Sequence, residues 1–264
     1  MRIVSTLGIS VFGLMFMVAS CTSARQTSPG DLDPSPGQPG GSLHDSAGGE
    51  ARVDAIREAF RAGRSGFDAV YSKDPGPARP AAMRFLPVVD QGAVVRFETS
   101  GSDAATHVHA VVGFAGKRDV RRANVALPLS ASGAVKLEDS SSKIAVAFSL
   151  DGMLDVKLAV KRGIGVYAKA YGEQADVVHR VHEEGTEDYV FFAERPARPE
   201  LSYRVEVSRV AGLRLVSNTL EFLDDSGTPM LRVAPPYVVD SKGERHEARL
   251  AVNGCAYDTS PVGP

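Results

Sequence analysis

The spacing of hydrophobic residues changes several times along the chain. Residues 3–19 are almost entirely apolar, and residues 22–49 contain scarcely a large apolar side chain. From about residue 85 onward, short apolar runs alternate with polar residues and are separated by turn residues, which is typical of β-strands. The pattern therefore predicts an apolar N-terminal segment, an unstructured stretch and a β-rich body over residues 85–264.

One segment before the body has helical periodicity. Val53, Ile56 and Phe60 recur at helical spacing, charged residues fill the other faces, and Gly63 is a plausible stop. Residues 50–63 are therefore expected to form a short amphipathic helix that packs one narrow apolar stripe onto the body. The mixed charge signs of its polar face do not suit a helix that lies in a membrane surface.

The body shows the two-residue period of strands most clearly near its middle. Ile144, Val146 and Phe148 alternate with the small residues Ala145 and Ala147. Similar short runs recur at roughly ten-residue spacing without intervening helices, which favours an antiparallel sandwich or a partly open barrel. The fold class predicted is therefore mainly β.

Turn signals divide the body further. Asp151-Gly152 lies between two β-like runs, 144–150 and 156–160, and predicts a hairpin. Asp224-Asp225-Ser226-Gly227 and Asp240-Ser241-Lys242-Gly243 are expected to join later strand pairs. A proline-rich break near residue 196 either separates two β-subdomains or connects two sheets.

The stretch over residues 21–49 is rich in Gly, Pro, Ser and Asp. Such a composition cannot bury enough apolar surface to offset the conformational entropy of folding. We expect a disordered tether whose mean end-to-end distance is roughly 30 Å.

The N-terminal segment has the layout of a secretory signal, because Arg2 is its only charge and an apolar run follows. The run ends in Val18-Ala19-Ser20-Cys21, which resembles the bacterial lipobox. The resemblance implies a signal peptide over residues 1–20, cleavage before Cys21, and acyl chains (such as palmitate) on that residue, which would anchor the protein stably. Thr22 is not acidic, so the outer membrane is expected if the cell is Gram-negative. An uncleaved transmembrane helix and a plain signal with a chance cysteine are the alternatives.

Composition narrows the class of protein. Of the 264 residues, 43% are hydrophobic and 23% are charged, and the formal net charge is −2. These values are ordinary for a globular protein and argue against a nucleic-acid partner, which basic surfaces attract. The roughly 240 residues after the signal suffice for one large or two small domains.

The chain has two cysteines, Cys21 and Cys255. If Cys21 carries lipid, Cys255 has no partner within the chain. It would then be an intermolecular thiol, part of an incomplete disulfide framework, or a buried free thiol.

Two histidine motifs have metal-like spacing. His107-x-His109 would place two imidazoles on one face of a strand, and a third ligand would have to come from Asp103 or a distant histidine, although surface histidines are the commoner explanation. His179-x-x-His182 differs from the metalloprotease pattern, because a strand would place these two histidines on opposite faces. An acidic cluster beside it could bind calcium, but we expect a solvated hairpin tip. The cluster consists of Glu183, Glu184, Glu187 and Asp188.

No nucleophile motif with a nearby base is found, including around Cys255, so the sequence predicts no catalytic residue and no metal or other cofactor.

The second half of the chain, about residues 160–264, resembles the N-terminal β-rich region of large secreted bacterial proteins, including myxobacterial ones, that carry Kelch or related β-propeller repeats. The motifs that carry this resemblance are Glu187-Asp188-Tyr189-Val190-Phe191, Val210-Ala211-Gly212-Leu213, Asn218-Thr219-Leu220-Glu221-Phe222-Leu223, and Ala234-Pro235-Pro236-Tyr237-Val238-Val239-Asp240 with Gly243. These motifs are structural, so the resemblance implies architecture and no activity. It also implies a shortened relative or a truncated gene, because the family's chains continue beyond this region.

Together these features predict a lipid-anchored, non-enzymatic β-protein of the cell envelope that acts as a binding or scaffolding module. Its partners would be the membrane, through the anchor, and an envelope protein or polysaccharide. The alternatives are a metal-dependent envelope hydrolase and a truncated remnant of a larger secreted repeat protein.

Overall fold

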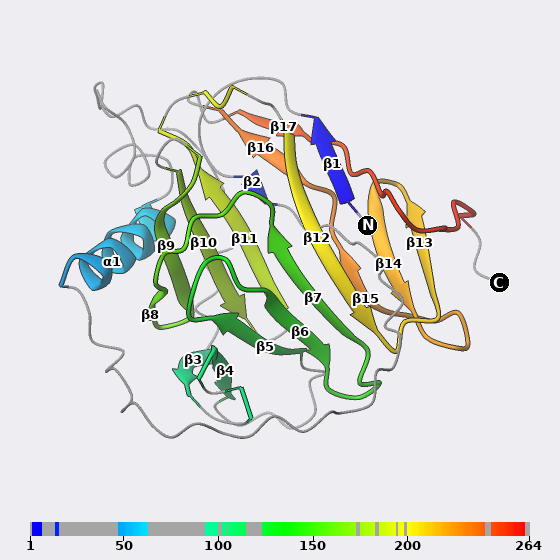
Figure 1. The fold of residues 1–264 in the computed structure, drawn as a ribbon, viewed down its shortest axis with the longest axis horizontal. Helices are drawn as coiled ribbons and strands as arrows, with labels where there is room; N and C mark the ends of the chain where they lie inside the picture. The colour runs from blue at the N-terminus through cyan, green and yellow to red at the C-terminus, as the bar shows by residue number, and fades with distance from the viewer. Residues whose placement is uncertain are drawn as a thin grey trace, which may run out of the picture.

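Strands dominate the described part of the chain, and every pairing between its named strands is antiparallel. The strands form two sheets of seven and one sheet of three (Figure 1). The structure is a computed structural model, and it describes residues 2–6, 14–15, 47–62, 93–99, 102–103, 105–114, 123–172, 175–182, 185–193, 195–197, 200–240 and 244–261.

The first sheet, sheet A, has the strand order β1-β12-β7-β6-β5-β4-β3. Strands β3 to β7 are consecutive in the sequence and form a meander, and β12 then pairs with β7 in a register that sets Tyr203 opposite Leu150. The bounds are β1 (Arg2–Thr6), β3 (Ala93–Glu98), β4 (His107–Phe114), β5 (Ala123–Pro128), β6 (Val135–Asp139), β7 (Ala145–Leu150) and β12 (Glu200–Ser208).

The second sheet, sheet B, has the order β17-β16-β2-β11-β10-β9-β8. Its strands are β2 (Leu14–Met15), β8 (Ala159–Lys161), β9 (Ile164–Tyr171), β10 (Ala175–His182), β11 (Gly185–Phe191), β16 (Tyr237–Val239) and β17 (Arg245–Glu247). The three-stranded sheet joins β13 (Gly212–Val216), β14 (Thr219–Leu223) and β15 (Pro229–Val233).

The main core contains the inward residues of both large sheets. Phe148 and Val205 of sheet A and Val177 and Val190 of sheet B are buried in one cluster, which also includes Phe222 of the small sheet. Burial alternates residue by residue along β7, as one buried face requires. The predicted mainly-β fold is therefore confirmed, and the arrangement is that of a sandwich.

Helix α1 (Ala47–Ala62) covers the other face of sheet B (Figure 1). Val53, Ile56 and Ala59 are buried against residues of β9, β10 and β11, such as Val178. The predicted amphipathic helix is thus present and begins three residues earlier than expected. The side chain of Phe60 and the position of Gly63 lie outside the description.

The hairpin predicted at Asp151-Gly152 is wrong. The strand before it, β7, pairs with β6 and β12 of sheet A, whereas the strand after it, β8, pairs with β9 of sheet B. Gly152 has a φ of +87°, so the turn itself exists, but it carries the chain from one sheet to the other. Alternation shows which face of a strand is buried and does not show which strand lies beside it.

The proline-rich segment near residue 196 also crosses between sheets, from β11 of sheet B to β12 of sheet A. Residues on both sides of it, Val190 and Leu201, belong to the same core cluster.

Two short strands come from the segment that we predicted as a signal. β1 pairs with β12 at the edge of sheet A, and β2 pairs with both β11 and β16 in sheet B. The lipobox with Cys21, and the tether up to residue 46, lie outside the described residues. Within the described part of the chain, no helix is long and apolar enough to cross a bilayer.

Candidate functional site: a groove on sheet A

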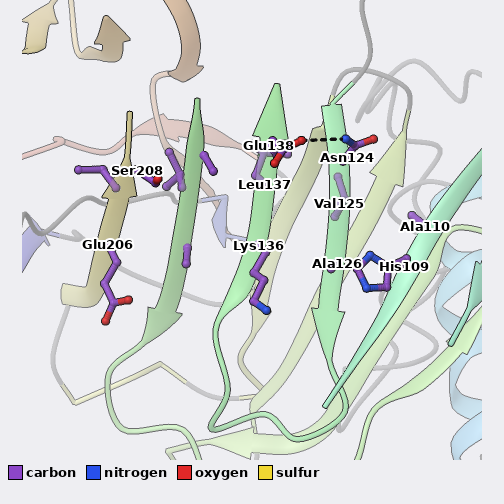
Figure 2. A pocket seen from close by; sticks show the side chains of 14 residues that line it. His109, Ala110, Asn124, Val125, Ala126, Lys136, Leu137, Glu138, Glu206 and Ser208 are labelled. Carbon is purple, nitrogen blue, oxygen red and sulfur yellow. Dashed lines mark hydrogen bonds between the residues drawn. The ribbon is translucent and has the colours of Figure 1, made fainter. Parts of the chain in front are cut away.

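The outward face of sheet A contains a groove of about 510 Å³ (Figure 2). Its residues come from β4, β5, β6, β7 and β12. Ala126, Ala145 and Ala147 line it from positions that alternate with inward core residues such as Val146. Small side chains at these outward positions leave the face hollow, and α1 covers sheet B rather than this face (Figure 1).

Polar side chains of both charge signs surround these alanines. Figure 2 shows Asn124 and Glu138 on adjacent strands, where the Asn124 amide donates to Glu138 Oε1 over 3.3 Å. Glu138 also accepts from Lys143 Nζ at 3.1 Å. Lys136 and Glu206 add an ammonium group and a carboxylate. The groove therefore offers hydrogen-bond donors and acceptors in close succession.

An ion cluster centred on Asp103 lies at one end of this face. His109 Nε2 donates to Asp103 Oδ1 over 2.7 Å, and Lys136 Nζ donates to Asp103 Oδ2 over 2.7 Å. These two hydrogen bonds hold the pKa of Asp103 well below its ordinary value, and the bond from Lys136 contributes more to this shift than the bond from His109. Asp103 is therefore an anionic anchor that positions two groove side chains.

Asp103 is the one of the two alternative third ligands that lies beside His107 and His109, but its contacts suit an ion cluster better than a metal site. His107 is buried; its Nε2 donates to Ala134 O over 2.9 Å, and its Nδ1 lies 2.9 Å from Thr106 Oγ1. A cation bound at Asp103 would have to displace the Lys136 ammonium group. Both the competing charge and the bonded imidazole nitrogens oppose metal binding.

The second histidine motif contains a buried pair. His179 and Asp188 are 5% and 3% exposed, and His179 Nδ1 donates to Asp188 Oδ1 over 2.5 Å. Thr186 Oγ1 donates to the same carboxylate oxygen over 3.0 Å. Tyr167 lies edge-on to the imidazole, and burial, together with the Asp188 carboxylate, raises the pKa of this tyrosine. The pair is thus enclosed by protein groups of the core.

The acidic cluster is not a single solvated tip. Asp188 points into the core, whereas its neighbour Glu187 accepts from Arg180 Nη1 over 3.0 Å and from Tyr189 OH over 3.3 Å on the other face of β11. Successive strand residues face opposite ways, so the two carboxylates cannot share one cation. The remaining members, Glu183 and Glu184, lie outside the described residues.

A further cluster of possible metal-ligating side chains was not predicted from the sequence. Asp240, Glu244 and His246 bring their ligand atoms within 4.8 Å of one another across the β16–β17 hairpin. The turn expected at residues 240–243 could have indicated this cluster, because such a turn sets Asp240 near the start of the next strand. His246 Nε2 lies 3.2 Å from Asp240 Oδ2, as in an ordinary surface ion pair, and we assign no metal to it.

Cys255 is disulfide-bonded in the structure, so the free-thiol alternative does not describe it. No described cysteine is free. The sequence contains one other cysteine, Cys21, which lies outside the described residues. A thioether to lipid and a disulfide bond both require the single sulfur of a cysteine, so these two states of Cys21 exclude each other.

Apart from His109, the groove residues were not singled out as site residues from the sequence either. The alternation of Ala145 and Ala147 with Val146 and Phe148 was visible, but alanine at outward positions is equally compatible with an ordinary solvent-exposed face. The strand order is needed to see that neighbouring strands also place small residues on the same part of this face.

Fold and groove together define an antiparallel β-sandwich with one face covered by a helix and a groove on the opposite face. The chain matches no family model, and comparison with curated proteins and with solved structures gives no match. The resemblance to secreted repeat proteins therefore stays a prediction.

Proposed function

We propose that the protein is a lipid-anchored, non-enzymatic binding protein of the cell envelope that holds a polysaccharide chain in the groove of sheet A. The single observation that carries this proposal is the groove, whose small side chains leave room beside hydrogen-bonding groups that suit a hydroxyl-rich occupant. The lipobox resemblance supports the anchor and the envelope location, with the outer membrane as the site if the cell is Gram-negative.

The lining suits a polysaccharide because it contains hydrogen-bonding groups of both kinds. Asn124 and Lys136 offer donors, and Glu138 and Glu206 offer acceptors. Hydroxyl groups both donate and accept hydrogen bonds, so they match a lining that mixes Asn124, Lys136 and Glu138.

A binding role also fits the state of the polar groups better than hydrolysis does. Lys136 and His109 bond to Asp103, and Glu138 bonds to Asn124 and Lys143, so these side chains are held in place. Side chains that are already positioned lose little conformational freedom when a ligand arrives. Metal-dependent hydrolysis would instead require the Asp103 cluster to release its ammonium partner.

The test is co-sedimentation with purified peptidoglycan sacculi, together with an array of soluble bacterial polysaccharides. Ala145→Arg and Ala147→Arg fill the groove, and we expect each to weaken binding at least about tenfold, which is about 1.4 kcal/mol. Ala197→Arg, at an exposed alanine of the loop between β11 and β12, is the matched control and should bind as the wild type does. Binding that survives both groove variants, or a wild type that binds no glycan, would refute the proposal.

A further inference from the structure

β12 carries an edge of sheet A that the predicted signal segment occupies. β1 pairs with it antiparallel, from Arg2 opposite Arg204 to Thr6 opposite Glu200, and no other described strand pairs with that edge. Under the proposed function residues 1–20 are removed on export, and the present inference rests on that step. The mature protein then lacks β1, and an uncovered strand edge is a template for another strand.

The backbone groups that become available can be identified. Asp151 N donates to Ser202 O over 2.8 Å, so Ser202 directs its hydrogen-bonding groups toward β7. These groups alternate in direction along a strand, and the outer edge is therefore served by the odd-numbered residues. They are Leu201, Tyr203, Val205 and Val207.

We propose that two mature copies pair through β12, antiparallel and with two-fold symmetry, in the register centred on Val205. Arg204 and Glu206 flank Val205, and both are exposed on the outward face of the sheet. This register sets Arg204 of each copy directly opposite Glu206 of the other. Opposite charges placed directly across a pair of strands stabilise the pairing, and this interface contains two such pairs.

The charges also select against neighbouring registers. A two-fold register centred on Arg204 sets two guanidinium groups against each other, and one centred on Glu206 sets two carboxylates against each other. Arg204 Nη2 lies 3.6 Å from Asp151 Oδ1 within its own copy, and its side chain is 62% exposed, so it remains accessible to a second chain.

Pairing at this edge changes the groove as well. Glu206 and Ser208 of β12 line one side of it, so Arg204 of the second copy would reach the groove wall at Glu206. The two copies of sheet A would become one continuous sheet with two grooves side by side. A polymer with repeating units could occupy both grooves at once and gain affinity from the second contact.

The experiment uses the mature lipoprotein, expressed from the gene with its signal and purified in detergent. Its molar mass is measured by sedimentation equilibrium in a buffer whose density matches that of the detergent. Wild type should be a dimer. Arg204→Glu and Glu206→Arg should each raise the dimer dissociation constant at least about tenfold. The double variant carrying both exchanges should recover the wild-type constant. Arg249→Glu makes the same charge change at another exposed arginine and should remain dimeric.

Three kinds of result would overturn the proposed pairing. A wild type that is processed but monomeric refutes the pairing, whatever covers the edge of β12. The proposals on the lipid anchor and on the groove are unaffected by that result. A double variant that stays monomeric, or single variants that stay dimeric, would place any dimer contact elsewhere. A mature protein that retains residues 1–20 by mass refutes both this pairing and the proposed processing.

Discussion

Individual side chains in this protein are defined mainly by which face of a strand they occupy. Asp188 and Glu187 are adjacent, yet one accepts a hydrogen bond from His179 inside the core and the other accepts from Arg180 on the opposite face. His107 and His109 share a face, but only His109 lines the groove. Chemistry at the residue scale thus depends on burial that residue type alone does not specify.

The buried His179–Asp188 pair should be important for stability. Asp188→Leu would leave His179 without its carboxylate in the core, and we expect the free energy of unfolding to fall by about 3–5 kcal/mol. The double variant His179→Leu, Asp188→Leu removes both groups and should lose clearly less. The chain has no tryptophan, so urea unfolding is followed by far-ultraviolet circular dichroism. A single variant within 1 kcal/mol of wild type would contradict the role of the pair.

Asp103 predicts a pH dependence. Its contacts with Lys136 and His109 lower its pKa in the folded state below the ordinary value of 3.8. The stability it contributes is therefore complete above that ordinary value and is lost as the pH falls toward the lowered pKa. Asp103→Asn should destabilise the protein at pH 7 by about 1 kcal/mol or less, because the cluster is solvent-accessible.

The difference in unfolding free energy between Asp103→Asn and wild type should shrink as the pH falls below about 4. Asp225→Asn, at an exposed turn carboxylate, serves as the control for an Asp-to-Asn exchange at the surface. A difference for Asp103→Asn that is constant from pH 7 to pH 3 would contradict the assignment.

At the scale of elements, the sequence specified what each segment becomes better than what it pairs with. The stripe of Val53 and Ile56 predicted α1, and the alternation around Val146 predicted β7, because these patterns are local. The partners of β7 are β6 and β12, and β12 lies some fifty residues further along the chain. Such pairing depends on the packing of whole sheets, so neither the failed hairpin nor the groove could be read from local periodicity.

Helix α1 is fixed to sheet B by charge as well as by its apolar stripe. Arg52 Nε and Nη2 both donate to Asp176 Oδ2, at 2.9 and 2.6 Å, and Asp176 is 1% exposed. Lys169 N donates to the other carboxylate oxygen over 2.9 Å. Docking the helix therefore compensates a buried charge near the start of β10.

Arg52→Ala should lower the free energy of unfolding by about 2 kcal/mol, because Asp176 would keep only its backbone donor. Backbone amides of α1 should also exchange hydrogen faster, as expected for a helix held less tightly. Arg57→Ala, which removes the same charge from the same helix, is the matched control. Equal effects of the two variants would show that the ion pair with Asp176 does not hold the helix.

At the scale of the whole molecule, the N-terminal segment is described in two different ways. As a sequence it has the layout of a signal that ends in a lipobox, whereas in the full-length structure it supplies β1 and β2. The two descriptions fit together if the full-length chain is a precursor whose strands leave with the signal. The mature body would then keep six of the seven strands of sheet A and lose the strand between β11 and β16.

The state of the two cysteines distinguishes these descriptions directly. In the full-length structure Cys255 is disulfide-bonded, and lipidation would commit the sulfur of Cys21 to a thioether. We expect the intact mass of the mature protein, isolated from membranes, to correspond to a chain that begins at Cys21 and carries acyl chains. After digestion, the peptide with Cys255 should not be linked to Cys21.

Cys21→Ala supplies the control, because it removes both the acylation site and the only other cysteine. It should keep residues 1–20, lose the acyl mass and leave Cys255 without an intrachain partner. A peptide of the wild-type protein that joins Cys21 to Cys255 through a disulfide would contradict lipidation. The N-terminal peptide in the same spectrum shows separately whether residues 1–20, and with them β1 on the edge of β12, have been removed, so one measurement tests the anchor and the condition for pairing together.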